Sequence, residues 1–154
     1  MTPTSTDRIE KRIHLDAPRS RVWRALTDSK EFGAWFQVRF DAPFRAGATL
    51  KGQITFPRFE HLSVAFVIKD IVPEKLFSYR WHPHAIDPAH DYSSEPMTLV
   101  EFHLADGGTG TDLTVVESGF DGIPIERRLA ALKGNDEGWT IQVTRIRDYV
   151  LAHP

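Results

Sequence analysis

Apolar and polar residues alternate near the start of the chain. The apolar members of this alternation are Ile9, Ile13 and Leu15. A period of two is the spacing of a strand that buries one face. The pattern therefore predicts a strand from Ile9 to Leu15.

Two short helices are predicted after this strand. Pro18 suits the first helical position. The apolar residues that follow it recur at helical spacings: Val22, Trp23 and Leu26. Asp28, within the run Thr27-Asp28-Ser29, offers an N-cap for the second helix. The apolar residues of that second helix are Phe32, Trp35 and Phe36.

Five further segments have the period of strands. They begin at Gly47 (with Leu50, Ile54 and Phe56 on one face) and continue as Leu62 to Val72, Leu76 to Trp81, Thr98 to Leu104 and Thr111 to Ser118. Pro73-Glu74-Lys75 and Asp106-Gly107-Gly108 are turn sequences, which indicates hairpins between neighbouring segments.

The last part of the chain is predicted to be a long, half-buried helix from about Pro124 to Ala152. Its apolar stripe consists of Ile125, Leu129, Leu132, Trp139, Val143, Ile146 and Val150. Gly134 and Gly138 interrupt the stripe, and we expect them to bend or break the helix. Consecutive hairpins flanked by helices are typical of the α+β class. We expect a curved antiparallel sheet of about six strands wrapped around this helix.

Composition limits the compartment and the chemistry. The 154 residues fit one domain over residues 1–154, and the net charge of −2 argues against a nucleic-acid partner. No cysteine is present, which excludes a thiolate nucleophile and a cysteine zinc site. The start of the chain lacks the apolar run of a signal peptide, and no apolar stretch approaches the roughly 20 residues that span a bilayer. We expect a cytoplasmic protein without a membrane partner.

Large apolar side chains gather on the faces predicted to point inward. On the sheet they are Phe66, Phe77, Tyr79, Trp81 and Phe102, and on the long helix Trp139, Val143 and Ile146. Each one alone fits a packed core. As a group they would line a ligand cavity if the helix does not fill the concave face of the sheet. The pattern leaves core and cavity open as alternatives.

Glu117 is the charged residue that strict alternation turns inward. A buried carboxylate is costly unless it is paired. One interpretation is structural: a salt bridge to Arg127, Arg128 or Arg24, or a local change of phase at the strand end before Gly119. The other is contact with a ligand, or a general acid or base in the cavity. Both interpretations remain open.

The segment from His82 to Pro96 is predicted to be a long loop, since it contains three prolines and no periodicity. Its weak candidates for metal ligands are His82, His84 and His90, together with Asp87 and Asp91. Their spacing matches no common metal site, and we favour a polar lid over the cavity mouth. The chain has no phosphate-binding loop, dinucleotide fingerprint or His-Glu-x-x-His motif, so we expect no metal and no cofactor.

Several segments together resemble one superfamily. They are Ala17-Pro18-Arg-Ser-Arg-Val22-Trp23-Arg-Ala25-Leu26-Thr27-Asp28, Trp35-Phe36, Leu113-Thr-Val-Val-Glu117-Ser118-Gly119-Phe120-Asp121 and Asn135-Asp-Glu-Gly138-Trp139. From about Ile9 to Val150 the chain resembles the START/birch-allergen (SRPBCC) superfamily. Within it, the likeness is to the bacterial branch similar to the C-terminal domain of heat-shock-protein ATPase activators.

The resemblance implies a helix-grip fold with a cavity between the sheet and the long helix. It implies no fixed catalytic set. We expect an apolar or aromatic small molecule to bind in that cavity. The alternatives are a cyclase- or hydrolase-type enzyme using Glu117 as acid or base, and a protein-interaction module with a chaperone partner. A pocket around an unpaired Glu117 would favour the enzyme, and an exposed apolar patch elsewhere would favour the module.

Overall fold

A computed structural model describes residues 7–154 of the chain. In chain order its elements are β1 (Arg8–Leu15), α1 (Arg19–Thr27), α2 (Ser29–Phe36), β2 (Val38–Phe40), β3 (Thr49–Ile54), β4 (Ser63–Val72), β5 (Leu76–Trp81), β6 (Thr98–Gly107), β7 (Gly110–Ser118), a 3-10 turn (Phe120–Gly122) and α3 (Ile125–Ala152). No helix in this part of the chain is long and apolar enough to cross a membrane.

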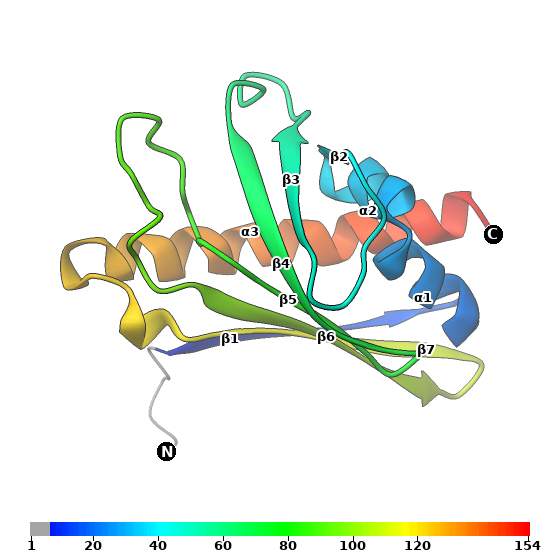
Figure 1. Cartoon of the computed structure of the whole chain (residues 1–154). Helices are drawn as coiled ribbons and strands as arrows, with labels where there is room; N and C mark the ends of the chain where they lie inside the picture. The colour runs from blue at the N-terminus through cyan, green and yellow to red at the C-terminus, as the bar shows by residue number, and fades with distance from the viewer. Residues whose placement is uncertain (1–6) are drawn as a thin grey trace, which may run out of the picture.

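The strands form one antiparallel sheet in the order β1-β7-β6-β5-β4-β3-β2. Figure 1 shows the sheet curving while α3 runs along it, with α1 and α2 near the C-terminal half of α3. The predicted α+β helix-grip architecture is confirmed, with seven strands among the described residues where about six were expected. The additional strand is β2, whose three residues are too short to show a period.

The two helices after β1 begin and end as their sequences predict. Pro18 is the N-cap residue of α1. Asp28 is the N-cap of α2, where its Oδ1 accepts hydrogen bonds from the backbone N–H of Lys30 (2.9 Å) and Glu31 (3.1 Å). Gln37 ends α2 in the left-handed region, with φ at 67°. The chain then turns directly into β2.

Helix α2 fills much of the concave face of the sheet. The ring of Phe32 lies with its centroid 5.7 Å from Phe66, 6.3 Å from Tyr79 and 6.2 Å from Phe102. Phe66 and Tyr79 in turn stack face to face at 3.9 Å. This part of the predicted cavity wall is therefore a packed aromatic core, because α2 supplies the side chains that occupy it.

Helix α3 is continuous, and the predicted break between Gly134 and Gly138 is wrong. All residues from Ile125 to Ala152 are helical. Gly134 instead leaves room for the ring of His84, since a Cβ atom at position 134 would lie 2.6 Å from Nδ1 of His84. Gly138 has open space at the position of a Cβ atom. The contact with His84 explains why a glycine stands at position 134. A glycine lowers the stability of a helix but does not by itself break it, so α3 continues through both positions.

Two further expectations are corrected. Ile125 and Leu129 do not face inward, because their exposed fractions are 76% and 75%. Figure 1 shows this end of α3 extending past the sheet. Phe56 is not part of a strand, since β3 ends at Ile54 and Phe56 lies in the following loop.

Candidate functional site

Glu117 on β7 is fully buried, and four neutral donors surround its carboxylate. Oε2 accepts from the indole Nε1 of Trp81 (2.7 Å) and the hydroxyl of Thr98 (2.6 Å). Oε1 accepts from the indole Nε1 of Trp139 (2.8 Å) and Nδ2 of Asn135 (2.9 Å). Each oxygen thus receives two hydrogen bonds, which offsets much of the cost of burying the charge.

The fold explains why these donors converge. Trp81 ends β5 and Thr98 begins β6, and the two are directly paired in the sheet. Asn135 and Trp139 are four residues apart and share one face of α3. Glu117 therefore ties both ends of the loop between β5 and β6 to the middle of α3.

The interpretation of Glu117 as the salt-bridge partner of an arginine is wrong. Arg127 bonds to Glu95, Arg128 donates to the backbone oxygens of Ile123 and Asp121, and Arg24 pairs with Glu31. The sequence alone could not identify the four actual donors, because they come from three separate segments.

The buried Glu117 carboxylate also affects Tyr79. Burial, assisted by this nearby charge, raises the pKa of the Tyr79 hydroxyl well above its usual value.

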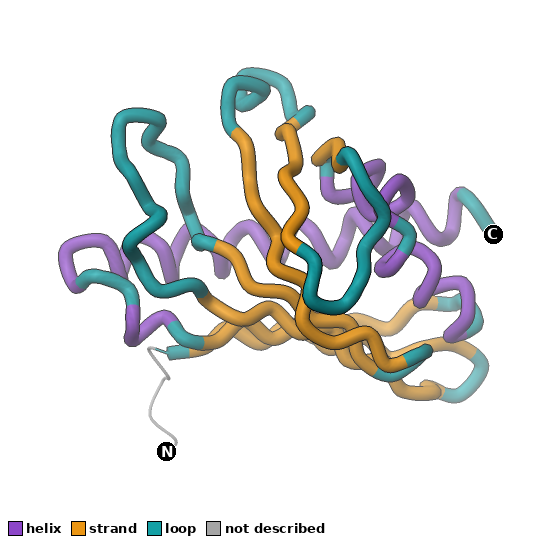
Figure 2. The backbone as a smooth tube through the Cα atoms, in the orientation of Figure 1, coloured by secondary structure: helices purple, strands orange, loops and turns teal. Residues whose placement is uncertain are grey.

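A groove of about 340 Å³ opens along α3, and we call it the α3 groove. One wall is α3 itself, the second is the loop from β3 to β4, and the third is the loop from β5 to β6. Figure 2 shows these two loops projecting on the same side of the sheet. The residues that line the groove are Phe36, Gln37, Ile54, Phe56, Phe59, Leu62, Ser63, Val64, Trp81, His82, His84, Ala85, Ile86, Asn135, Gly138, Ile141, Gln142 and Arg145.

Exposed apolar side chains gather at the α3 groove. Phe56, Phe59, Ile86 and Ile141 all line it, with exposed fractions between 37% and 53%. Beneath it, a smaller hollow of about 90 Å³ lies against Trp81 and is also lined by Trp139, Asn135 and Gly138. These two indoles bond to Glu117, so the carboxylate lies just behind the floor of the groove.

The residues predicted to contact a ligand are divided between this groove and the core. Trp81 lines the α3 groove, and Trp139 lines the hollow beneath it. The others are Phe66, Phe77, Tyr79, Phe102 and Ile146, all buried in the aromatic core, Val143, which packs against that core, and Glu117, which is behind the two indoles. None of these seven lines the groove or the hollow.

Sequence reasoning missed the polar residues of the groove. Gln37 and Gln142 each have a buried side-chain oxygen without a hydrogen-bond donor. Arg145 places its guanidinium carbon 5.2 Å from the centroid of the Phe56 ring. A helical projection could have found part of this set, because Asn135, Gly138, Gln142 and Arg145 recur at spacings of three and four.

A second hollow, of about 530 Å³, adjoins the α3 groove across the β4 segment Ser63–Val64. Its lining is more polar and includes Lys51, His61 and Asp87. Mostly apolar walls with a few placed polar groups are typical of small-molecule sites. The α3 groove fits that description better.

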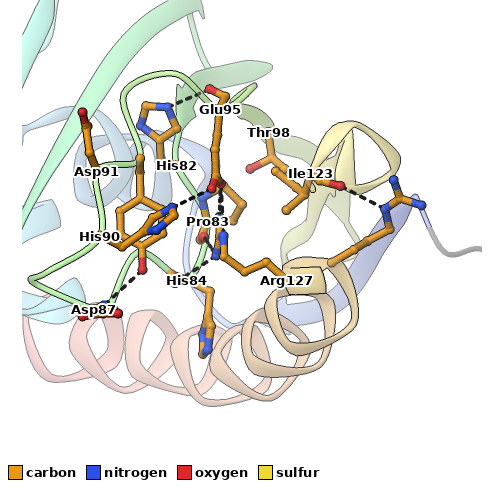
Figure 3. Close-up of polar contacts among 12 residues, drawn as sticks. His82, Pro83, His84, Asp87, His90, Asp91, Glu95, Thr98, Ile123 and Arg127 are labelled. Atoms are coloured by element: carbon orange, nitrogen blue, oxygen red, sulfur yellow. Dashed lines mark hydrogen bonds and ion pairs between the residues drawn. The ribbon is translucent and has the colours of Figure 1, made fainter. Parts of the chain in front are cut away.

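An ion pair fastens the loop between β5 and β6 to the first turn of α3. Arg127 donates from Nε (3.0 Å) and Nη2 (2.8 Å) to Oε1 of Glu95, and its Nη1 donates to the backbone oxygens of Pro83 and His84. His90 lies 2.8 Å from the other oxygen of Glu95. Figure 3 shows Arg127 reaching the loop from the helix. Burial raises the pKa of Glu95, but its bonds to Arg127 and His90 outweigh this and lower it overall.

The three candidate metal-ligand histidines do not converge. Figure 3 shows His82 and His90 turned toward Glu95 while His84 points to α3. His82 contacts the backbone oxygen of Glu95 (3.0 Å), and the ring of His84 packs on Gly134. Over residues 7–154, no group of three histidine, aspartate or glutamate side chains is arranged to hold a metal ion.

Comparison with solved structures gives the same fold in several bacterial proteins. Protein MLL2253 from Mesorhizobium loti is 22% identical, with a TM-score of 0.74 over 96% of this chain and 98% of that one. The Aha1 protein from Colwellia psychrerythraea, solved as a dimer, is 17% identical, with a TM-score of 0.70 over 93% and 95% of the two chains.

A third structure, DynU16, is described as a putative protein of the dynemicin biosynthetic locus. It is 24% identical, with a TM-score of 0.72 over 96% of this chain, which spans about half (48%) of DynU16. No curated protein matches the chain.

A family-wide sequence model settles the classification. The model for Activator of Hsp90 ATPase homolog 1-like proteins matches residues 16–150. The resemblance seen in the motifs of the chain is thereby confirmed. The protein belongs to the family of Activator of Hsp90 ATPase homolog 1-like proteins.

Proposed function

We propose that the protein binds an apolar or aromatic small molecule in the α3 groove. The observation that carries this proposal is the gathering of four exposed apolar side chains around an open groove whose floor is Trp81 and Phe36. Its volume of about 340 Å³ lies within the range of small-molecule sites, roughly 300–1,000 Å³. Covering these side chains with a ligand removes apolar surface from water, at about 25 cal/mol per Å².

The surroundings of Glu117 favour binding over acid–base chemistry at that residue. All four of its hydrogen bonds come from the protein, and it lines neither the groove nor the hollow. A general base needs hydrogen-bond reach to the proton that it removes. In this arrangement Glu117 positions the indoles of Trp81 and Trp139, which form the ligand-facing surface.

The test uses the open space at Gly138. A leucine at this position projects into the α3 groove, because nothing lies within 4 Å of a Cβ atom there. Titration with the neutral fluorophore N-phenyl-1-naphthylamine should give saturable emission with the wild-type protein. Gly138→Leu should abolish this response. Thr140→Leu adds the same side chain at an exposed position of α3 outside the groove and should leave it unchanged.

Two results contradict the proposal: no saturable binding to the wild type, or equal binding by Gly138→Leu. The protein-interaction alternative would then be preferred, with the exposed Ile125 and Leu129 at the start of α3 as the apolar surface to examine first.

A further inference from the structure

The lining of the α3 groove carries positive charge and no negative charge. Among its lining residues there is no aspartate and no glutamate, while Arg145 contributes a permanent positive charge. Within the described residues, Arg145 makes no ion pair, and its guanidinium lies over Phe56. By contrast, Arg147 on the same helix pairs with Asp148 at 3.2 Å. Arg145 is thus a cation at an apolar groove without an anion of its own.

His84, which also lines the groove, adds no positive charge. Burial, together with the neighbouring Arg127 charge, lowers the pKa of His84 below its usual value, so its ring is neutral at pH 7. His82 contacts the backbone oxygen of Glu95. Arg145 is therefore the group that would select for charge.

Two glutamines that line the groove have unpaired acceptor atoms. The side-chain oxygens of Gln37 and Gln142 are buried and receive no hydrogen bond. Gln142 is oriented by its Nε2 atom, which donates to the backbone oxygen of Phe36 at 3.4 Å, so its carbonyl oxygen is the free atom. Leaving a buried acceptor unpaired is unfavourable, and a donor on a ligand would satisfy it.

These groups share one face of α3 with the apolar wall. Gln142 and Arg145 are three residues apart, a rise of about 4.5 Å along the helix. Gly138 lies one turn before Gln142 and leaves room for a flat ring beside Phe36 and Trp81. Gly138 and Arg145 are seven residues apart, a rise of about 10.5 Å along the helix, so a ligand that contacts both must be elongated.

We propose that the α3 groove recognises aromatic acids: flat aromatic molecules that carry an anionic group for Arg145 and a hydroxyl or N–H group for the oxygen of Gln142. This inference rests on the proposed function, since it names the ligand class of the same groove. The rings lie over Gly138, and the anion remains near the open rim.

Two probes with the same rings test the charge preference. 8-Anilino-1-naphthalenesulfonate and N-phenyl-1-naphthylamine share the naphthalene, the phenyl ring and the N–H group, and only the first is an anion. The wild type should bind the sulfonate about fivefold more tightly, as expected of a charge-assisted contact at a partly exposed site. Arg145→Gln should remove this preference, so that the variant binds the two probes with similar affinity.

Further variants distinguish binding in the groove from recognition of the anionic group. Arg147→Gln removes a positive charge from the same helix outside the groove and should keep the preference. Gly138→Leu should lose both probes, which excludes adventitious adsorption. Gln142→Met should weaken the neutral probe, whose N–H group has no acceptor within the molecule and is free to donate to Gln142.

The outcomes are distinguishable. If the wild type binds neither probe, the proposed function itself is wrong. If it binds both equally, or if Arg145→Gln keeps the preference for the sulfonate, groove binding stands and recognition of an acid is wrong. If Gln142→Met binds the neutral probe as tightly as the wild type, the role of Gln142 as an acceptor is wrong.

Discussion

Glu117 on β7 and Trp139 on α3 are joined by a buried hydrogen bond of 2.8 Å from the indole Nε1 to the carboxylate Oε1. The same carboxylate holds Trp81, Thr98 and Asn135, so a single side chain connects the sheet, the long helix and both ends of the loop that walls the groove. The shape of the α3 groove therefore depends on this buried network of hydrogen bonds.

Glu117→Gln should therefore destabilise the protein without a change in size. An amide offers one acceptor oxygen and one NH₂ group, so at least one of the two indole N–H groups would face another donor. We expect a loss of about 3 kcal/mol in the free energy of unfolding, measured by urea denaturation. Glu137→Gln makes the same change at an exposed position of α3 and should stay within about 0.5 kcal/mol of the wild type. Equal stability of Glu117→Gln and the wild type would contradict the network.

The two glycines of α3 should respond in opposite directions to alanine. Gly138→Ala places a methyl group in open space and should raise stability by about 0.5–1 kcal/mol through helix propensity. Gly134→Ala places it 2.6 Å from the ring of His84 and should lower stability or displace the loop. Adding His84→Ala to Gly134→Ala should restore the gain. Equal gains for both single variants, in thermal melts, would show that His84 does not pack on Gly134.

The ion pair between Arg127 and Glu95 should give a pH-dependent contribution to stability. The folded-state pKa of Glu95 lies below its unfolded value, so its contribution is fully present above the unfolded pKa of about 4.3 and is lost as the pH falls through the folded pKa. The difference in unfolding free energy between the wild type and Glu95→Gln should thus shrink on acidification from pH 6. A difference that is constant from pH 6 to pH 3 would contradict this assignment.

Zinc should leave the protein unchanged. His82, His84 and His90 face different neighbours, and no cluster of ligands forms over residues 7–154. An equimolar amount of zinc is expected to leave Tm unaltered, since a ligand that binds the native state at 100 times its Kd would add about 2.7 kcal/mol. A rise in Tm that disappears in His84→Ala would overturn this expectation.

The sequence predicts the architecture well because periodicity reports which face of each element is buried. Strand β5 and the N-cap at Asp28 follow directly from local patterns. The packing of α2 into the concave face does not, because the same apolar stripe on Phe32 fits a core or a cavity wall. Periodicity places Glu117 inside, but only the fold brings its donors together from β5, β6 and α3.

The most direct test of the groove is the indole N–H spectrum, because the chain has four tryptophans and two lie at the site. Trp81 and Trp139 donate to Glu117, whereas Trp35 donates to the backbone oxygen of Ala25 and Trp23 lies on α1. In ¹H–¹⁵N NMR titrations with N-phenyl-1-naphthylamine, the account predicts saturable shifts of the Trp81 and Trp139 indole signals, while those of Trp23 and Trp35 stay in place. Unchanged Trp81 and Trp139 signals at saturation, or shifts confined to Trp23 and Trp35, would contradict binding in the α3 groove.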